Sequence, residues 1–299
     1  MSLKVNICGI EFNNPVIAAS GTFGFGKEFA DYIDINKLGG ISSKGLTLHK
    51  NLGNKGIRIY ETAAGIMNSI GLQNPGIEYF IKEELQFLET KDAVTIANLG
   101  GHSVDEYVKG AILLDKTSVP IIELNISCPN VKEGGMAFGT NPKKACEVIE
   151  KVRKATKKVL MVKLSPNVGD IKEFVKIAEN SGADCISLVN TFNALAIDVD
   201  NKKAVFENKT AGLSGPCIKP IALRMVYEAS NATNLPIIGM GGISNYRDCL
   251  EFIMAGASAV QVGTSNFVDF NTMINIVDDL EKYMQRENLN SLEEIRKII

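Results

Sequence analysis

A hexapeptide with the residue types for acid–base chemistry directly follows the apolar run at residues 119–124. It reads Asn125-Ile126-Ser127-Cys128-Pro129-Asn130. A short apolar strand that runs into a polar loop puts Asn125 at the strand's carboxyl end and Cys128 just beyond it. In proteins built on parallel strands, ligands bind and reactions occur at that edge. Cys128 is therefore a candidate general base or nucleophile, and the alternative is a buried thiol that packs as a small apolar side chain.

Two lysines stand at the ends of other apolar runs. Lys44 follows residues 40–43, and Lys163 follows residues 159–162. An ammonium in apolar surroundings costs free energy unless an anionic group pairs with it. Lys163 would suit a cation beside a reduced flavin, or an amine that forms a Schiff base. The alternative is a lysine whose stem is buried and whose ammonium reaches water at the rim.

The elements that must position these residues are apolar strands, each followed by an amphipathic helix. β-branched residues and flanking glycines identify eight strands. We predict them at residues 16–19, 40–43, 93–98, 121–125, 160–164, 185–190, 237–240 and 259–262. Eight β–α units predict one α/β domain over residues 1–299, a (βα)8 TIM barrel. A doubly wound open sheet is the alternative, but Gly24-Phe25-Gly26 lacks the third glycine of its fingerprint.

Three segments are additional to the eight β–α units of a minimal barrel. Residues 3–14 predict an N-terminal hairpin that could plug the barrel floor. Residues 45–76 form a glycine-rich excursion, and residues 192–214 form a polar insertion. Loops this long inside a compact domain usually carry function, so we expect inserted active-site loops. At the end of the chain, Ser291 and Glu294 have the spacing of a capping box before a helix.

Nearly every predicted strand delivers a polar residue or a glycine to the same rim. These residues are Ser20, Lys44, Asn98, Asn125, Lys163, Asn190, Thr191, Gly241, Gly242, Gly263 and Thr264. The glycines after the last two strands, together with Gly215, predict a phosphate cradle, because exposed backbone amides supply donors there. Residues 65–74 add three amide side chains suited to gripping a planar polar ring. A plain structural loop is the alternative for both segments.

Composition restricts the partners that this chain can have. Its 299 residues carry a net charge of −2 with no basic block, which argues against nucleic acid and anionic membrane. We find no membrane-length apolar run and no signal-peptide pattern. The six cysteines form no C-x-x-C pair and there are two histidines, which argues against a disulfide framework and a metal site. We therefore expect a cytoplasmic protein with reduced thiols and no metal.

Several motifs occur together in this chain. They are residues 20–26 (SGTFGFG), 43–47 (SKGLT), 65–74 (GIMNSIGLQN), 125–130 (NISCPN), 162–167 (VKLSPN), 189–191 (VNT) and 239–243 (GMGGI). In combination they resemble the class 1 dihydroorotate dehydrogenases, and within them the catalytic subunit of the NAD-linked subclass B. The resemblance covers essentially the whole chain. Glu133 departs from it, since many relatives carry a histidine at that position.

The resemblance implies an FMN enzyme that oxidises (S)-dihydroorotate to orotate in de novo pyrimidine biosynthesis, with Cys128 as the base. The implied FMN contacts are Ser20, Lys44, Gly45, Asn98, Asn125, Lys163, Val189, Gly215, Gly241, Gly242, Gly263 and Thr264. The implied substrate contacts are Lys44, Asn68, Ser69, Ile70, Gly71, Leu72, Asn125, Asn190 and Thr191. It also implies a homodimer within a heterotetramer. Its partner would be an electron-transfer subunit that carries FAD and an iron–sulfur centre and passes electrons to NAD.

Other functions remain open at this point. A fumarate-linked class 1 dihydroorotate dehydrogenase, or a related dihydropyrimidine oxidoreductase, would share part of the motif set. From the residues alone, Lys163 also allows a Schiff-base aldolase, and the glycine cradle allows a non-catalytic flavin-binding subunit. The chain contains no dinucleotide fingerprint, so electrons bound for NAD would have to leave through another polypeptide.

Overall fold

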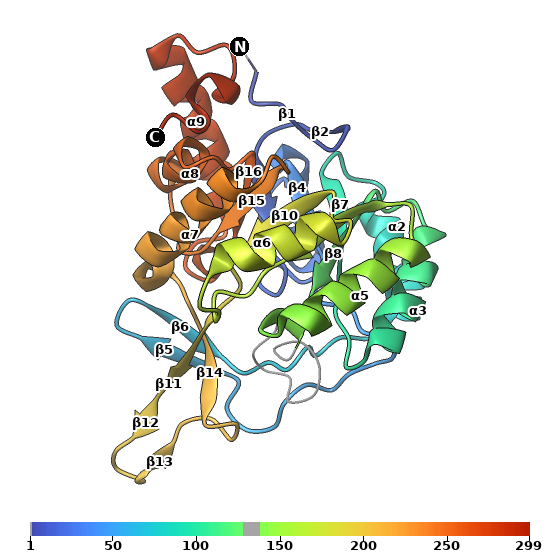
Figure 1. Cartoon of the computed structure of the whole chain (residues 1–299). Helices are drawn as coiled ribbons and strands as arrows, with labels where there is room; N and C mark the ends of the chain where they lie inside the picture. The colour runs from blue at the N-terminus through green and yellow to red at the C-terminus, as the bar shows by residue number, and fades with distance from the viewer. Residues whose placement is uncertain (1, 128–137) are drawn as a thin grey trace.

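The computed structural model describes residues 2–127 and 138–299, and its centre is a closed barrel of eight parallel strands (Figure 1). Around the barrel the strand order is β10-β15-β16-β3-β4-β7-β8-β9. These strands are β3 (Val16–Ala18), β4 (Gly40–Ser42), β7 (Val94–Leu99), β8 (Ile121–Asn125), β9 (Val159–Lys163), β10 (Cys185–Leu188), β15 (Ile237–Met240) and β16 (Ala259–Val262). All eight predicted strands are present, with ends within two residues of those expected. The prediction of a (βα)8 barrel is confirmed.

Helices cover the outside of the barrel (Figure 1). The α-helices are α1 (Ile77–Tyr79), α2 (Leu85–Leu88), α3 (Val104–Asp115), α5 (Pro142–Ala155), α6 (Ile171–Asn180), α7 (Lys219–Ala232), α8 (Tyr246–Met254) and α9 (Thr272–Glu287). Short 3-10 helices are η1 (Lys27–Phe29), η2 (Ile35–Lys37), η4 (Pro216–Ile218), η5 (Thr264–Phe267) and η6 (Leu292–Ile295). The predicted capping box at Ser291 and Glu294 is present, and it begins η6.

The helical segment before β7 contains one π turn, η3 (Phe80–Glu84), between α1 and α2. Phe80 and Leu85 are both buried although they are five positions apart in the sequence. On a straight α-helix that spacing would leave them about 140° apart. The wider π turn brings them to the same side, so one face of this segment stays apolar.

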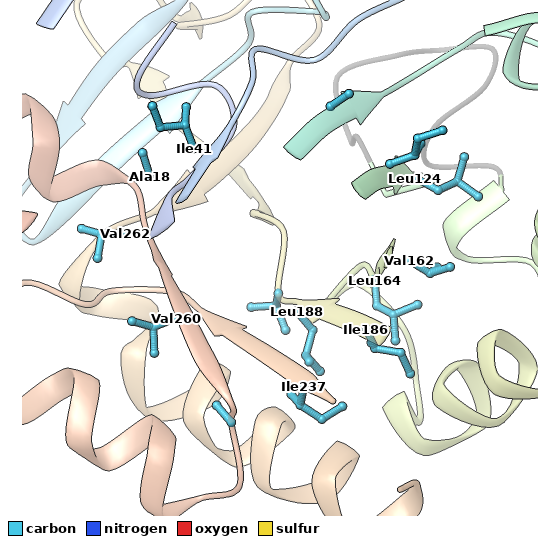
Figure 2. Packing of buried hydrophobic residues seen from close by; sticks show 14 of the residues in the cluster. Ala18, Ile41, Leu124, Val162, Leu164, Ile186, Leu188, Ile237, Val260 and Val262 are labelled. Carbon is cyan, nitrogen blue, oxygen red and sulfur yellow. The ribbon is translucent and has the colours of Figure 1, made fainter. Parts of the chain in front are cut away.

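Strand residues alternate between two apolar environments. Outward-facing side chains such as Ala18, Leu124, Val162, Ile186 and Val260 belong to the large core between the barrel and its helices (Figure 2). Inward-facing side chains at the amino ends of the strands form a second cluster inside the barrel. The two-residue period of a strand therefore assigns each position to the helix side or to the barrel interior.

The N-terminal hairpin closes the bottom of the barrel. Strands β1 (Val5–Ile7) and β2 (Ile10–Phe12) pair in antiparallel fashion. Ile7 and Phe12 are fully buried, and they pack in one cluster with Ile17, Ile121 and other inward-facing strand residues. The predicted plug is confirmed, and the barrel's open end is the opposite one, at the carboxyl ends of the strands.

The two long excursions pair with each other instead of forming separate loops. Strands β5 (Ile59–Thr62) and β6 (Gly65–Asn68) come from the first, and β11 (Phe192–Leu195) and β14 (Thr210–Ser214) from the second. They form one antiparallel sheet in the order β11-β14-β6-β5. The sheet projects from the barrel with β12 (Ile197–Asp198) and β13 (Lys203–Ala204) at its far end (Figure 1). Within the described ranges, no helix combines the length and apolarity that crossing a bilayer requires.

Candidate functional site

A pocket at the carboxyl ends of the barrel strands gathers most of the residues expected from the sequence. The expected residues that line it are Ser20, Lys44, Gly45, Asn68, Ile70, Gly71, Leu72, Asn125, Lys163, Val189, Asn190, Thr191, Gly241, Gly242, Gly263 and Thr264. Ile59, Ile66 and Ser214 of the projecting sheet also line the pocket. The sheet formed by the two excursions is thus one wall of the site.

Four of the expected residues are not among the described residues that line the pocket. Ser69 is buried and accepts hydrogen bonds from the side chains of Asn54 and Asn208, so it supports the loop behind the wall. Asn98 is fully buried one layer beneath the pocket, and Gly215 packs against the backbone of the residue that begins β6. Cys128 lies outside the described residues, as does Glu133.

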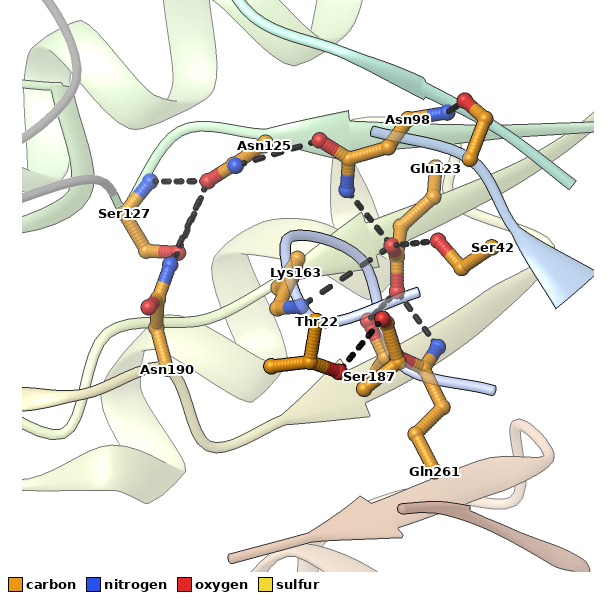
Figure 3. A network of polar contacts seen from close by, with 12 residues as sticks. Thr22, Ser42, Asn98, Glu123, Asn125, Ser127, Lys163, Ser187, Asn190 and Gln261 are labelled. Atoms are coloured by element: carbon orange, nitrogen blue, oxygen red, sulfur yellow. Dashed lines mark hydrogen bonds and ion pairs between the residues drawn. The ribbon is translucent and has the colours of Figure 1, made fainter. Parts of the chain in front are cut away.

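Glu123 is the functional candidate that sequence reasoning missed. It points into the barrel from β8, two residues before Asn125, and it is fully buried. Its carboxylate accepts four hydrogen bonds from four other strands (Figure 3). The donors are Ser42 Oγ at 2.7 Å, Asn98 Nδ2 at 2.6 Å, Ser187 Oγ at 2.7 Å and Gln261 Nε2 at 2.7 Å. The available signal was an acidic residue at an inward position of an otherwise apolar strand.

Lys163 is the cation that accompanies this carboxylate. Its Nζ lies 3.9 Å from Glu123 Oε2, and its side chain is only 6 % exposed. Burial raises the pKa of the Glu123 carboxyl, but the Lys163 ammonium and the accepted hydrogen bonds outweigh burial and lower that pKa. Lys163 is therefore a buried partner in an ion pair at the pocket floor, and the alternative of an ammonium that reaches water at the rim is wrong.

A chain of amide groups leads from Glu123 to the pocket. Asn98 donates to Glu123, and Asn125 Nδ2 donates to Asn98 Oδ1 at 3.2 Å (Figure 3). The Oδ1 atom of Asn125 accepts from Ser127 Oγ at 3.2 Å and from Asn190 Nδ2 at 3.4 Å. A carboxylate only accepts hydrogen bonds, so its position determines which way each amide in the chain points.

The opposite end of the pocket is built from backbone. Gly242 has a φ of +76°, and a Cβ there would lie 2.8 Å from the Gly215 carbonyl oxygen and 3.0 Å from the Lys219 amide nitrogen. The start of α7 thus approaches the loop after β15 with no room for a side chain. Thr264 Oγ1 donates to Ser214 Oγ at 2.9 Å and joins η5 to β14. This end fits the predicted cradle for a phosphate group.

Lys44 adds a second cation to the pocket. Its side chain is half-buried at the end of β4. Burial lowers its pKa, and the positive charge of Arg58 adds to this effect, while the negative charge of Glu28 opposes it. Within the described ranges, no group of three or more His, Cys, Asp or Glu side chains could hold a metal ion.

Taken together, a backbone cradle, two lysines and converging amides define a (βα)8-barrel protein with a pocket suited to an anionic group and to a small polar ring. The comparison with protein families agrees. The family model described as dihydroorotate dehydrogenase matches residues 2–284, and the chain belongs to this family.

Several relatives match along nearly their whole length. A protein from Petrotoga mobilis is 61 % identical over 296 residues, which is 99 % of this chain and 99 % of that protein. One from Thermoanaerobacter pseudethanolicus is 52 % identical over 100 % of this chain and 98 % of its own length. One from Bacteroides thetaiotaomicron is 49 % identical over 98 % of this chain and 97 % of its own length. Each of these is named dihydroorotate dehydrogenase B (NAD(+)), catalytic subunit.

Asp248 holds Lys219 at the start of α7, next to the cradle, and this ion pair predicts how the stability of the protein depends on pH. Asp248, at the start of α8, accepts hydrogen bonds from the Lys219 ammonium at 2.6 Å and from the Ser244 amide at 2.8 Å. Burial raises the pKa of Asp248, but these hydrogen bonds outweigh it and lower that pKa. Asp248→Asn should reduce the free energy of unfolding at pH 7 by about 1–3 kcal/mol.

The sign of the pH effect follows from the lowered pKa. The stabilisation by Asp248 is complete above its unfolded pKa of about 3.9 and is lost as pH falls through the lower folded value. Urea unfolding from pH 7 down to pH 2 should therefore show a constant difference above about pH 4 that shrinks below it. Glu251→Gln is the matched control, since Glu251 also pairs with Lys219 but is 43 % exposed, and it should have little effect. A constant difference across this range would contradict the assignment.

Proposed function

We propose that this chain oxidises (S)-dihydroorotate to orotate in pyrimidine biosynthesis, with FMN as its cofactor. The observation that carries the proposal is the buried Lys163–Glu123 pair beneath a pocket with a backbone cradle at one end and amide side chains at the other. Membership in the dihydroorotate dehydrogenase family supports the substrate.

The residues of the pocket fit FMN. Gly215 and Gly242 approach other backbone with no room for side chains, so bare backbone forms this end together with Gly263 and Thr264, as a phosphate cradle requires. When bound, FMN would supply the acceptor for the hydride that leaves carbon 6 of the substrate. Lys163 would donate a hydrogen bond to the electron-rich part of the ring system and stabilise negative charge there. The remaining proposed contacts are Ser20, Lys44, Gly45, Asn98, Asn125, Val189 and Gly241.

The amide side chains would hold dihydroorotate. Asn68, Asn125 and Asn190 with Thr191 offer both donors and acceptors, which suits a ring that carries carbonyl and N–H groups and a carboxylate. Since Asn125 and Asn190 are hydrogen-bonded to each other, the substrate meets a fixed arrangement. Fixing the ring in this way lowers the entropy lost on reaching the transition state. The proposed contacts also include Lys44 and residues 69–72.

Cys128 would be the base that removes the proton from carbon 5. It directly follows Ser127, whose hydroxyl accepts a hydrogen bond from Asn190 at 2.8 Å among the proposed substrate contacts. Ser127, the last described residue before it, is thus bonded to the substrate end of the pocket. A thiol with an ordinary pKa of about 8.5 is better matched to proton removal near neutral pH than a serine hydroxyl.

NAD would receive the electrons through a second polypeptide. Relatives are named as catalytic subunits of NAD-linked enzymes, which supports a partner subunit for this chain as well. We propose that the partner carries FAD and an iron–sulfur centre, and that two copies of this chain pair within a heterotetramer. A fumarate-linked dihydroorotate dehydrogenase is the second candidate, and the choice of electron acceptor separates the two.

A visible spectrum tests the proposed function. The purified chain should carry about one FMN, and anaerobic dihydroorotate should bleach the flavin absorbance while orotate appears. A Schiff-base aldolase would be colourless, and a non-catalytic flavin subunit would stay yellow after dihydroorotate is added. Colourless, folded protein that takes up no added FMN would refute the proposal.

The role of Cys128 predicts a specific kinetic defect. Cys128→Ala should bind FMN normally but slow flavin reduction by dihydroorotate by roughly a hundredfold or more, the usual effect of losing a positioned base. Cys128→Ser should be slow at neutral pH and improve as pH rises. Stopped-flow single turnovers measure both, with Cys146→Ala on α5 as a control that should match the wild type. An unchanged rate in Cys128→Ala would remove the thiol from the mechanism.

The missing dinucleotide fingerprint predicts which acceptors the isolated chain can use. With dihydroorotate under anaerobic conditions it should reduce an artificial dye but neither NAD nor fumarate at a comparable rate. Adding the separately purified electron-transfer subunit should restore NAD reduction. Rapid NAD reduction by the isolated chain would disprove the two-subunit arrangement, and rapid fumarate reduction would favour the fumarate-linked enzyme.

A further inference from the structure

We propose that Glu123 is a positioning residue that sets the redox potential of the bound flavin by compensating the charge of Lys163. This inference rests on the proposed function, since it requires FMN in the pocket. Glu123 acts from beneath the pocket, because it is fully buried one layer below Asn125. Its influence on the cofactor must therefore pass through the residues that it contacts.

The groups around Glu123 stabilise its carboxyl in the ionised, negatively charged form. A carboxylate inside a barrel loses its hydration, and an apolar residue of similar size would avoid that cost. Here the loss is offset by four hydrogen bonds from β4, β7, β10 and β16 and by the ammonium on β9. Six of the eight barrel strands thus contribute a group to this one carboxylate, counting its own strand.

Lys163 transmits the effect of this carboxylate to the pocket. Its ammonium lies 3.9 Å from Glu123 and also lines the pocket. Paired in this way, the two side chains have no net charge, and the pocket floor presents a hydrogen-bond donor without a full positive charge. Charges interact strongly at such distances when water is excluded. Removing the negative charge alone would expose the flavin to an uncompensated cation, which favours the reduced, more negative form.

The amide chain gives Glu123 a second route to the site. Because a carboxylate cannot donate, Asn98 must turn its NH2 group toward it and its oxygen toward Asn125. Asn125 consequently presents its oxygen to Asn190 at the substrate end. A glutamine at position 123 has one oxygen and one NH2 group, so it cannot accept all four hydrogen bonds.

Glu123→Gln tests the proposal, with the flavin midpoint potential as the readout. Equilibration against a reference dye under anaerobic conditions should show the reduction equilibrium shifted at least tenfold toward reduced flavin. For a two-electron couple this is an upward shift of about 30 mV. Ser187→Ala is the matched control, since it removes one hydrogen bond to Glu123 and leaves both charges in place. It should lower the stability to urea without moving the potential.

The double variant Glu123→Gln/Lys163→Met covers the case in which Glu123→Gln does not fold. It replaces an ion pair that has no net charge by two uncharged side chains, and buried ion pairs often tolerate such an exchange. Because no cation is left uncompensated, its reduction equilibrium should not move toward reduced flavin, and the lost Lys163 hydrogen bond should if anything move it the other way. A shift of tenfold or more toward reduced flavin in the double variant would overturn the proposal.

Each outcome separates the two proposals. FMN-loaded Glu123→Gln with an unchanged potential, or Ser187→Ala with an equal shift, overturns the role of Glu123 and leaves the proposed function intact. Wild-type protein that takes up no FMN overturns both.

Discussion

The fold depends on satisfying one buried carboxylate. Removing Glu123 from water is costly, and the interior of the barrel meets that cost with four hydrogen bonds and a cation that come from different strands. Those strands must close around it in one register, because a shift of one residue would turn each inward donor to the helix side. Glu123 and the groups that bind it therefore specify how the barrel closes. Through Lys163 and Asn98 they also determine which hydrogen-bonding groups face the pocket.

The barrel is organised in layers along its axis. The N-terminal hairpin and the apolar residues around Phe12 fill the bottom, the Glu123 layer lies above them, and the pocket opens above that. Strand alternation produces this order with a step of two residues, as Ile121, Glu123 and Asn125 show on β8. An apolar floor excludes water from the ion pair, and a polar rim receives the ligand, so stability and binding use different parts of the same strands.

The sequence predicted the parts of this molecule that depend on local pattern. Strand positions follow from apolar runs and glycines, and the rim residues follow from the ends of those strands, so distant residues such as Lys44 and Gly242 were correctly expected in one place. Glu123 was not recognised, since its partners are inward positions on other strands, and their convergence appears only when the barrel closes. The projecting sheet was missed for a similar reason. Its strands pair across more than a hundred residues, as with Asn68 and Gly212, and nothing local marks that pairing.

This long-range pairing also explains how two insertions can serve one site. Asn68 Nδ2 donates to the Gly212 carbonyl oxygen at 3.3 Å, which ties the first excursion to the second. A Cβ at Gly212 would lie 2.1 Å from Thr191 Oγ1, so the absence of a side chain lets Thr191 pack against the same strand. Asn68 and Thr191, which come from opposite halves of the chain, are thereby held on either side of one glycine. The backbone hydrogen bonds of the sheet fix the distance between these two residues. Two unpaired loops would let that distance vary.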